Sequence, residues 1–240
     1  MSECQEHKGH YSLIHSFAID SLIMAKVIIF GVMDTAELAH FYLTHDSEHE
    51  VAAFTVSREY MSGTEFRGLP LVAFEEVETV FSPQEYKFFA PMTGRGMNKN
   101  RERIYLEAKA KGYAFISYVS SKATLFGNEI GENCFILEDN TIQPFTTIGN
   151  NVVLWSGNHI GHHGQIKDHV FFTSHVVMSG HCIIEPYCFF GVNSTIRDFL
   201  HIATGTLVGM ASAIYKNTDE WGLYIGNPAK KLPKPSYEAY

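Results

Sequence analysis

A large apolar residue occupies every sixth position in the second half of the chain, from Ile130 to Ile214. The side chain four places further on is small at most of these steps, and Leu200 is the large exception. A repeat of six residues is typical of a parallel β-helix, in which each hexad supplies one short strand and one corner. Three hexads make one triangular coil, so residues eighteen apart stack, with neighbouring coils about 4.8 Å apart.

The first half of the chain has a different pattern, in which short apolar runs alternate with segments of helical spacing. Buried strands are predicted over residues 26–31, 50–56 and 86–90, where the runs KVIIFG, EVAAFTV and YKFFA are largely apolar. Helices are predicted over residues 34–43, 74–81 and 98–112, and residues 66–72 are predicted to form a turn. This order indicates a small, Rossmann-like parallel sheet with right-handed crossovers.

The two patterns divide the chain into domains. Residues 26–112 are expected to form the α/β domain, and residues 113–240 the β-helix with a C-terminal tail. Residues 1–25 precede the first clear strand and are interpreted as an extension. They lack a basic segment followed by a long apolar one, so no secretory signal is expected.

Composition narrows the class of protein. The formal net charge of −8 argues against a nucleic-acid surface, and no run of eighteen apolar residues predicts a membrane span. The four cysteines form no CxxC pair, which favours a reduced, cytoplasmic protein. Cys134, Cys182 and Cys188 fall in the small position of the hexad, so they are interpreted as core-filling residues rather than catalytic thiols.

Six of the thirteen histidines fall within residues 158–181, which read NHIGHHGQIKDHVFFTSHVVMSGH. Four of them follow a large apolar residue by three places: His163, His169, His175 and His181. Successive hexads lie on successive faces of the triangle, so only His163 and His181 should stack. We therefore expect no metal site within one chain, although a site on a threefold axis and a pH switch remain open. His162 is different, because it lies two places after Ile160 and should project outward near a corner.

The hexads, followed by Tyr224-Ile225-Gly226-Asn227-Pro228-Ala229-Lys230, resemble the left-handed β-helix acyltransferases. With the α/β half included, residues 26–232 resemble bacterial sugar acetyltransferases that act on nucleotide-linked amino sugars, and the related sialic-acid O-acetyltransferases. The resemblance implies a left-handed β-helix, acetyl-CoA as acyl donor, and N-acetylation of a nucleotide-linked deoxysugar in bacterial surface-glycan biosynthesis. Sugar O-acetylation is the alternative. A non-catalytic or zinc-binding hexapeptide-repeat protein is a further one, and a nicotinamide-dependent reductase is disfavoured because GxGxxG is absent.

The same resemblance implies roles for individual residues. His162 would be the general base that deprotonates the sugar amine or hydroxyl. The family often has an acidic residue directly after this histidine, but here the residue is His163. The partner that orients His162 is therefore left open among Gln143, Glu138 and Asp139, with Gln143 taken as the catalytic partner. A backbone amide of the Ser179-Gly180 turn would bind the thioester oxyanion. Coenzyme A would run past Val192 and Gly209 and end at Pro228 and Lys230.

The remaining expectations concern the nucleotide and the assembly. The turn containing Gly31, Met33 and Asp34 would contact the nucleotide, and Arg58, Arg95 and Arg101 are candidate diphosphate contacts. The resemblance also implies a homotrimer with active sites between subunits. Four aromatic residues lie off the inward positions and are expected to face outward at that interface: Trp155, Phe171, Tyr187 and Phe189.

Overall fold

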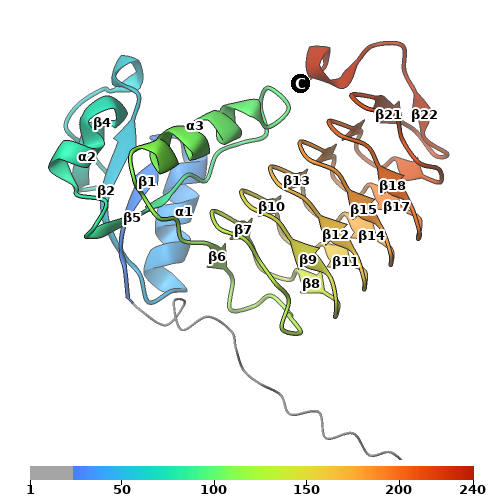
Figure 1. The fold of residues 1–240 in the computed structure, drawn as a ribbon, viewed down its shortest axis with the longest axis horizontal. Helices are drawn as coiled ribbons and strands as arrows, with labels where there is room; N and C mark the ends of the chain where they lie inside the picture. The colour runs from blue at the N-terminus through green and yellow to red at the C-terminus, as the bar shows by residue number, and fades with distance from the viewer. Residues whose placement is uncertain (1–23) are drawn as a thin grey trace, which may run out of the picture.

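The computed structural model describes residues 24–240, so nearly all of the expected extension over residues 1–25 lies outside the described residues. A small α/β unit lies beside a long β-helix, and α3 (Lys99–Ala110) extends between them, as Figure 1 shows. Within residues 24–240, none of the helices combines the length and the apolar character that crossing a bilayer requires.

The N-terminal sheet has the strand order β3-β4-β2-β1-β5. Its strands are β1 (Lys26–Phe30), β2 (Glu50–Val56), β3 (Glu65–Phe66), β4 (Leu69–Ala73) and β5 (Tyr86–Phe89). Strands β4, β2, β1 and β5 run parallel, whereas β3 is antiparallel to β4. The expected strands at 26–31, 50–56 and 86–90 are confirmed, but the turn expected over 66–72 is present only at Arg67 and Gly68, and the residues after it belong to β4. Gly68 and Pro70 indicate a turn, yet proline is tolerated here because β4 pairs with only the two-residue β3 on its outer side.

The helices pack on this sheet through small or apolar side chains. They are α1 (Asp34–His45), α2 (Val77–Val80) and α3, with short 3₁₀ turns at η2 (Arg58–Tyr60) and η3 (Phe74–Glu76). Ala36, Ala39 and Leu43 of α1 are buried in the core shared with β1 and β2. Ile104 and Ala108 of α3 pack in a second core on the side of β5. The predicted helices are therefore confirmed, with 74–81 divided into η3 and α2.

The β-helix has three walls that the chain visits in turn. The first wall contains β6 (Tyr118–Val119), β7 (Phe135–Ile136), β10 (Val153–Leu154), β13 (Phe171–Phe172), β16 (Phe189–Phe190), β19 (Leu207–Val208), β21 (Leu223–Ile225) and β22 (Lys230–Lys231). The second contains β8 (Thr141–Ile142), β11 (His159–Ile160), β14 (Val177–Met178), β17 (Thr195–Ile196) and β20 (Ala213–Ile214). The third contains β9 (Thr147–Ile148), β12 (Gln165–Ile166), β15 (Ile183–Ile184) and β18 (His201–Ile202), and η4 (Ser236–Glu238) lies in the tail.

Strand pairing confirms the coil of eighteen residues. Val153 pairs with Phe171 on the first wall, and Val177 pairs with Thr195 on the second. The large residues of the hexad point inward and, from Ile136 onward, are at most 4% exposed. The small position is inward too, and Cys134, Cys182 and Cys188 are fully buried. Burial raises the pKa of Cys134 to about 11 and that of Cys188 to about 12, so these thiols stay protonated near neutral pH.

Corner geometry explains why histidine recurs at six-residue intervals. The residue three places after each large apolar residue takes a left-handed backbone conformation, with φ between 54° and 62° at His163, His169, His175 and His181. Asparagine, aspartate and histidine tolerate this conformation better than most residues. Asn133, Asn151 and Asn193 occupy the same position elsewhere, and Gly157 and Gly205 do so with φ near 78° and 67°. The six-residue spacing of the histidines is thus explained by the backbone conformation of the corners, before any chemical role is considered.

The N-terminal domain covers the outer face of the first wall. Phe171 and Phe189 point outward from the β-helix but are only 5% and 7% exposed, because they join one core with β1, β2 and α1. Phe189 also packs against the tilted ring of Tyr240 at the end of the tail. Tyr187 is half-buried and donates a hydrogen bond to Glu102 of α3, 2.6 Å away. The expectation that these aromatic residues form an interface between subunits is therefore wrong, since this chain covers them itself.

One carboxylate ties the end of α1 to the first coil. Asp46 accepts hydrogen bonds from the Tyr118 hydroxyl at 2.6 Å, the Ser120 hydroxyl at 3.1 Å and the Ser121 backbone N–H at 3.0 Å. Partial burial alone would raise the pKa of this carboxyl, but these hydrogen bonds outweigh that effect and lower it to about 2. The ionised form is therefore part of the contact between the two domains.

Replacing Asp46→Asn should lower the free energy of unfolding by about 1–2 kcal/mol at pH 7, because charge-assisted hydrogen bonds are lost. The folded-state pKa lies below the usual value of 3.8, so the wild-type advantage is full above that pH and disappears as the pH falls toward 2. Denaturant unfolding of both proteins between pH 7 and pH 3 measures the difference. A gap that stays constant across this range would contradict the assigned role.

Candidate active site

An exposed column of aromatic rings runs along the corner between the second and third walls. His163 stacks on His181 with ring centres 5.0 Å apart, as the eighteen-residue spacing predicts. Phe145 caps one end of the column, 4.7 Å from His163, and Phe199 caps the other, 4.5 Å from His181. All four residues are exposed and have positive φ. The corner thus presents the two histidines between two phenylalanines.

His162 lies beside this column, at the turn that leaves β11. Its ring is perpendicular to those of His163 and His181, with centres 5.1 Å from each. Its Nδ1 is 2.9 Å from the Nδ1 of His163, so one of these nitrogens carries the shared proton. The side-chain oxygen of Gln143 accepts a hydrogen bond from the His162 backbone N–H at 3.1 Å. Gln143 therefore positions the main chain of His162, while His163 contacts its ring.

Two glycines give the His162 ring its space. A Cβ on Gly180 would lie only 2.9 Å from Cε1 and 3.0 Å from Nε2 of His162, so the ring packs directly over this residue. A Cβ on Gly161 would meet the backbone of Ser179 and Gly180 within 2.6 Å. Close stacking of these two coils therefore depends on glycine at 161, whereas glycine at 180 makes room for the His162 ring.

The backbone amides of the Ser179-Gly180 turn differ in availability. The Ser179 N–H donates to the Ile196 carbonyl oxygen at 3.0 Å and belongs to the coil ladder. No described residue accepts a hydrogen bond from the Gly180 N–H. Gly180 thus lies under the ring of His162, and its N–H has no acceptor among the described residues.

The other expected coenzyme A contacts lie on a different corner. Val192 and Gly209 follow strands of the first wall and precede strands of the second, so the second wall separates them from His162. Pro228 and Lys230 belong to the β21–β22 hairpin on the first wall, and both are exposed. The fold brings His162, Gln143, Ser179 and Gly180 together but places the second group of residues elsewhere on the surface.

Two of the three proposed orienting residues lie away from the His162 ring. Glu138 accepts hydrogen bonds from Tyr42 and Ser156, so it joins α1 to the corner between the first and second walls. Asp139 has φ of 59° at that same corner. Neither carboxylate lies on the corner of His162, and the described residue that contacts the ring nitrogen is His163.

The expected nucleotide contacts lie at the carboxyl ends of β1 and β2. Because these strands are parallel, Gly31, Met33 and Asp34 come close to Arg58. Arg58 pairs with Glu76 at 2.7 Å, and its backbone N–H donates to Glu75. Carboxylates thus surround this edge, which favours contacts with hydroxyl or base groups over contacts with phosphate.

The two other arginines have contrasting surroundings. Arg95 is exposed, so it remains available to a ligand. Arg101 is fully buried between α3 and the β-helix, where it lies over the Phe171 ring and donates to the Asn151 carbonyl oxygen. The expected contact between Arg101 and a diphosphate is therefore wrong.

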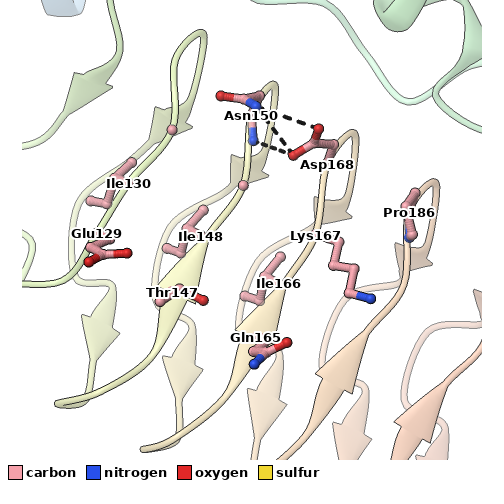
Figure 2. Close-up of a pocket in the computed structure, with 12 residues that line it drawn as sticks. Glu129, Ile130, Thr147, Ile148, Asn150, Gln165, Ile166, Lys167, Asp168 and Pro186 are labelled. Carbon is pink, nitrogen blue, oxygen red and sulfur yellow. Dashed lines mark hydrogen bonds between the residues drawn. The ribbon is translucent and has the colours of Figure 1, made fainter.

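A groove of about 530 Å³ lies on the outer face of the third wall, over β9 and β12. Figure 2 shows that Asn150 and Asp168 contact each other across neighbouring coils at its edge. Lys167 pairs with Glu185 at 2.8 Å. Lys167 and Asp168 thus already have polar partners, and His162 is not among the lining residues of this groove. The corner that carries His162 is the better candidate for chemistry.

Comparison with known proteins supports the fold. Residues 129–162 match the family described as bacterial transferase hexapeptide (six repeats). A curated relative from Pseudomonas savastanoi pv. phaseolicola is named acyl-[acyl-carrier-protein]–UDP-N-acetylglucosamine O-acyltransferase. It is 28% identical over 85 residues, which are 35% of this chain and 33% of the relative. The match therefore spans about a third of either protein.

Solved structures match much more of the chain. A variant of perosamine N-acetyltransferase from Caulobacter crescentus, in complex with CoA and GDP-perosamine, has a TM-score of 0.79 at 18% identity over 88% of this chain and 99% of that one. The acetyltransferase domain of PglB from Neisseria gonorrhoeae, in complex with acetyl coenzyme A, has a TM-score of 0.77 at 18% identity over 87% and 100%. WeeI from Acinetobacter baumannii has a TM-score of 0.73 at 19% identity over 87% of this chain and 100% of that one.

This chain has the two-part fold of the sugar acetyltransferases. The expected architecture, an α/β domain followed by a left-handed parallel β-helix, is confirmed. The resemblance to the hexapeptide-repeat transferases is confirmed as well. The contact of His162 with both His163 and His181 was not anticipated from the sequence. The signal was available, because residues 162 and 163 must lie beside 180 and 181 in a coil of eighteen residues.

Replacing Gly180→Ala should leave the fold intact, because the backbone at this position suits any residue, but it should displace the His162 ring. If His162 is the catalytic base, turnover should fall by roughly 10–100-fold, because displacement of a reacting group by about 1 Å costs up to about 100-fold in rate. Acetyl transfer and thermal unfolding would be measured together. In a His162→Ala background the same replacement should cause no further loss, and an additive loss would contradict an effect through the ring.

Proposed function

We propose that this protein is an acetyl-CoA-dependent acetyltransferase that acetylates an amino group of a nucleotide-linked sugar. The observation that carries the proposal is the exposed His162 ring packed over Gly180, a residue whose N–H has no acceptor among the described residues. A base and an oxyanion donor side by side are what acyl transfer from a thioester requires. The likeness to structures solved with CoA and GDP-perosamine supports the choice of donor and of acceptor class.

The proposed reaction is direct transfer. The sugar nitrogen attacks the thioester carbonyl carbon, and the Gly180 N–H stabilises the charge that develops on the carbonyl oxygen. His162 takes a proton from the nitrogen, the C–S bond breaks as the amide forms, and the protonated His162 returns the proton to the thiolate, so that CoA leaves as a thiol. The three cysteines within residues 24–240 are buried and protonated, which supports a route without an acyl-cysteine intermediate.

His163 would set the tautomer of the base. Only one proton fits between the two Nδ1 atoms, which are 2.9 Å apart. When His162 donates this proton, its Nε2 has a free lone pair and can act as base, whereas the reverse arrangement places a hydrogen on Nε2. His163 would therefore take the place of the acidic residue that often follows the base in related enzymes. A neutral imidazole accepts the hydrogen bond but adds no negative charge.

The site would be completed by a second copy of the chain. The contacts near His162 and those at Val192, Gly209 and Pro228 lie on separate corners, so one chain offers no continuous path for coenzyme A along a single corner. In a homotrimer, a neighbouring subunit could place its second set of residues beside the first set. Sedimentation equilibrium would test this part of the proposal. Use of acetyl-CoA would place the reaction in the cytoplasm.

Transfer to a hydroxyl is the second candidate, since the curated relative is named as an O-acyltransferase. The chemistry at His162 is the same for both acceptors, so the acceptor atom must come from assay. We expect release of CoA with nucleotide-linked amino sugars and little with the matching hydroxyl sugars or sialic acid. Faster turnover with a hydroxyl acceptor would decide for O-acetylation.

Replacing His162→Ala should lower turnover by about 10²–10⁴-fold, the usual contribution of a general base, while acetyl-CoA binding is kept. Steady-state release of CoA and calorimetric titration with acetyl-CoA measure the two effects separately. His201→Ala is the control, because His201 is also exposed but lies in β18 on the third wall, away from both corners of the proposed site. Unchanged turnover in His162→Ala would remove this residue from the proposed role.

Two replacements at His163 test the tautomer. Both asparagine and glycine suit its φ of 54°, but only asparagine offers an oxygen that can accept the His162 proton. His163→Gly should lower kcat about tenfold, equivalent to one hydrogen bond, with little change in KM. His163→Asn should stay near the wild-type value. Equal losses in the two variants would show that the hydrogen bond to Nδ1 does not matter.

A further inference from the structure

Three histidine side chains on the corner between the second and third walls form a compact set of nitrogen ligands. His162, His163 and His181 each offer one ring nitrogen, and these atoms all lie within 4.8 Å of one another. All three side chains are exposed. We therefore looked beyond the base itself to what the set could bind.

The geometry is close to that of a three-histidine metal centre. Zinc–nitrogen bonds of about 2.0–2.1 Å in a tetrahedron place the nitrogens roughly 3.3–3.4 Å apart. The His162 and His163 Nδ1 atoms are 2.9 Å apart, so they need only a small separation to admit an ion. The stacked ring of either His163 or His181 must turn to aim its nitrogen at the ion. The exposure of these rings leaves room for that rotation.

The main chain holds the three residues in place before any ion binds. The His163 N–H donates to the Pro144 carbonyl oxygen at 3.2 Å, and the His181 N–H donates to that of His162 at 2.9 Å. The ligands thus come from two coils that are already hydrogen-bonded to each other. Binding would fix only side-chain rotations, which keeps the entropic cost of forming the site low.

We propose that His162, His163 and His181 bind one Zn²⁺ ion per chain and that the ion inhibits acetyl transfer. Imidazole suits zinc among the divalent ions, and three histidines leave a fourth position for water. The earlier expectation of no metal site considered four histidines spread over three corners and left His162 out of the set. The inhibitory part rests on the proposed function, because an ion bound to Nδ1 of His162 leaves the hydrogen of that ring on Nε2, where the base needs a free lone pair. The binding part does not.

Binding is tested by calorimetric titration of the untagged, full-length protein with ZnCl₂, in the absence of acetyl-CoA. Residues 1–23 contain further histidines and a cysteine, so variants rather than stoichiometry alone must decide. His181→Asn removes one ligand at a turn position that asparagine tolerates, and His175→Asn makes the same change on another corner. Replacing a residue that hydrogen-bonds to a metal ligand already lowers metal affinity about 10–100-fold. Loss of a ligand itself in His181→Asn should therefore weaken zinc binding at least about tenfold. His175→Asn should not change it.

Equal zinc affinity in wild type and His181→Asn, or no zinc binding in the micromolar range, would overturn the site.

Inhibition is measured as the zinc concentration that halves CoA release, with recovery on adding a chelator. We expect His181→Asn to need at least about tenfold more zinc than wild type, in proportion to its loss of affinity. Full activity of the zinc-saturated protein would overturn the inhibitory role. The protein could bind zinc through His181 and yet transfer acetyl groups to none of the acceptors. That result would contradict the proposed function and support the metal site.

Discussion

Every corner of the β-helix requires a residue in the left-handed backbone conformation. For residues other than glycine, this conformation costs about 1 kcal/mol or more, and the β-helix imposes it about once in six residues. Hydrogen bonds between coils and the closely packed interior offset that cost. The corners are thus where this sequence is most constrained by the fold. The asparagines and histidines that occupy several of these corners also carry polar side chains.

The structure uses this constraint in two ways. At the corner between the third and first walls, Asn133, Asn151 and His169 form a buried hydrogen-bonded chain, with side-chain atoms 2.8 and 2.9 Å apart. The Ala90 N–H donates to Asn133, so the α/β domain docks against this chain. Burial lowers the pKa of Arg101, which donates to the backbone of the same column. At the corner between the second and third walls, the equivalent column is exposed and carries His163 and His181.

Much of this architecture could be predicted from the sequence because the period of six is strong. The inward residues, the buried cysteines and the stacking of His163 on His181 all follow from counting along the chain. Strand β4 was missed because Pro70 and Gly68 indicate a turn, and local preference does not report pairing with a distant strand. The contact between His162 and His163 depends on ring orientation at one turn, which periodicity does not specify.

The outward aromatic residues show a different limit. Periodicity gives the direction in which Phe171 and Phe189 point, but it does not reveal what covers them. The covering surface comes from β1, β2 and α1, more than a hundred residues earlier in the chain. Arg101 was misplaced for the same reason, since a polar residue on a helix is usually exposed and only docking of α3 buries it. Long-range packing thus accounts for most of the errors.

The register of the coils also limits how the length of this chain can change. Adding or removing six residues would turn every later hexad onto the next wall, and would carry Gly180 away from His162. Any change that is not a multiple of six would also shift inward residues to the surface. Only a change by whole coils of eighteen residues keeps each hexad on its wall with its large residue inward. Even so, an extra coil between residues 162 and 180 would separate His162 from Gly180. Variation in length is therefore confined to the ends of the β-helix and to loops that leave its corners.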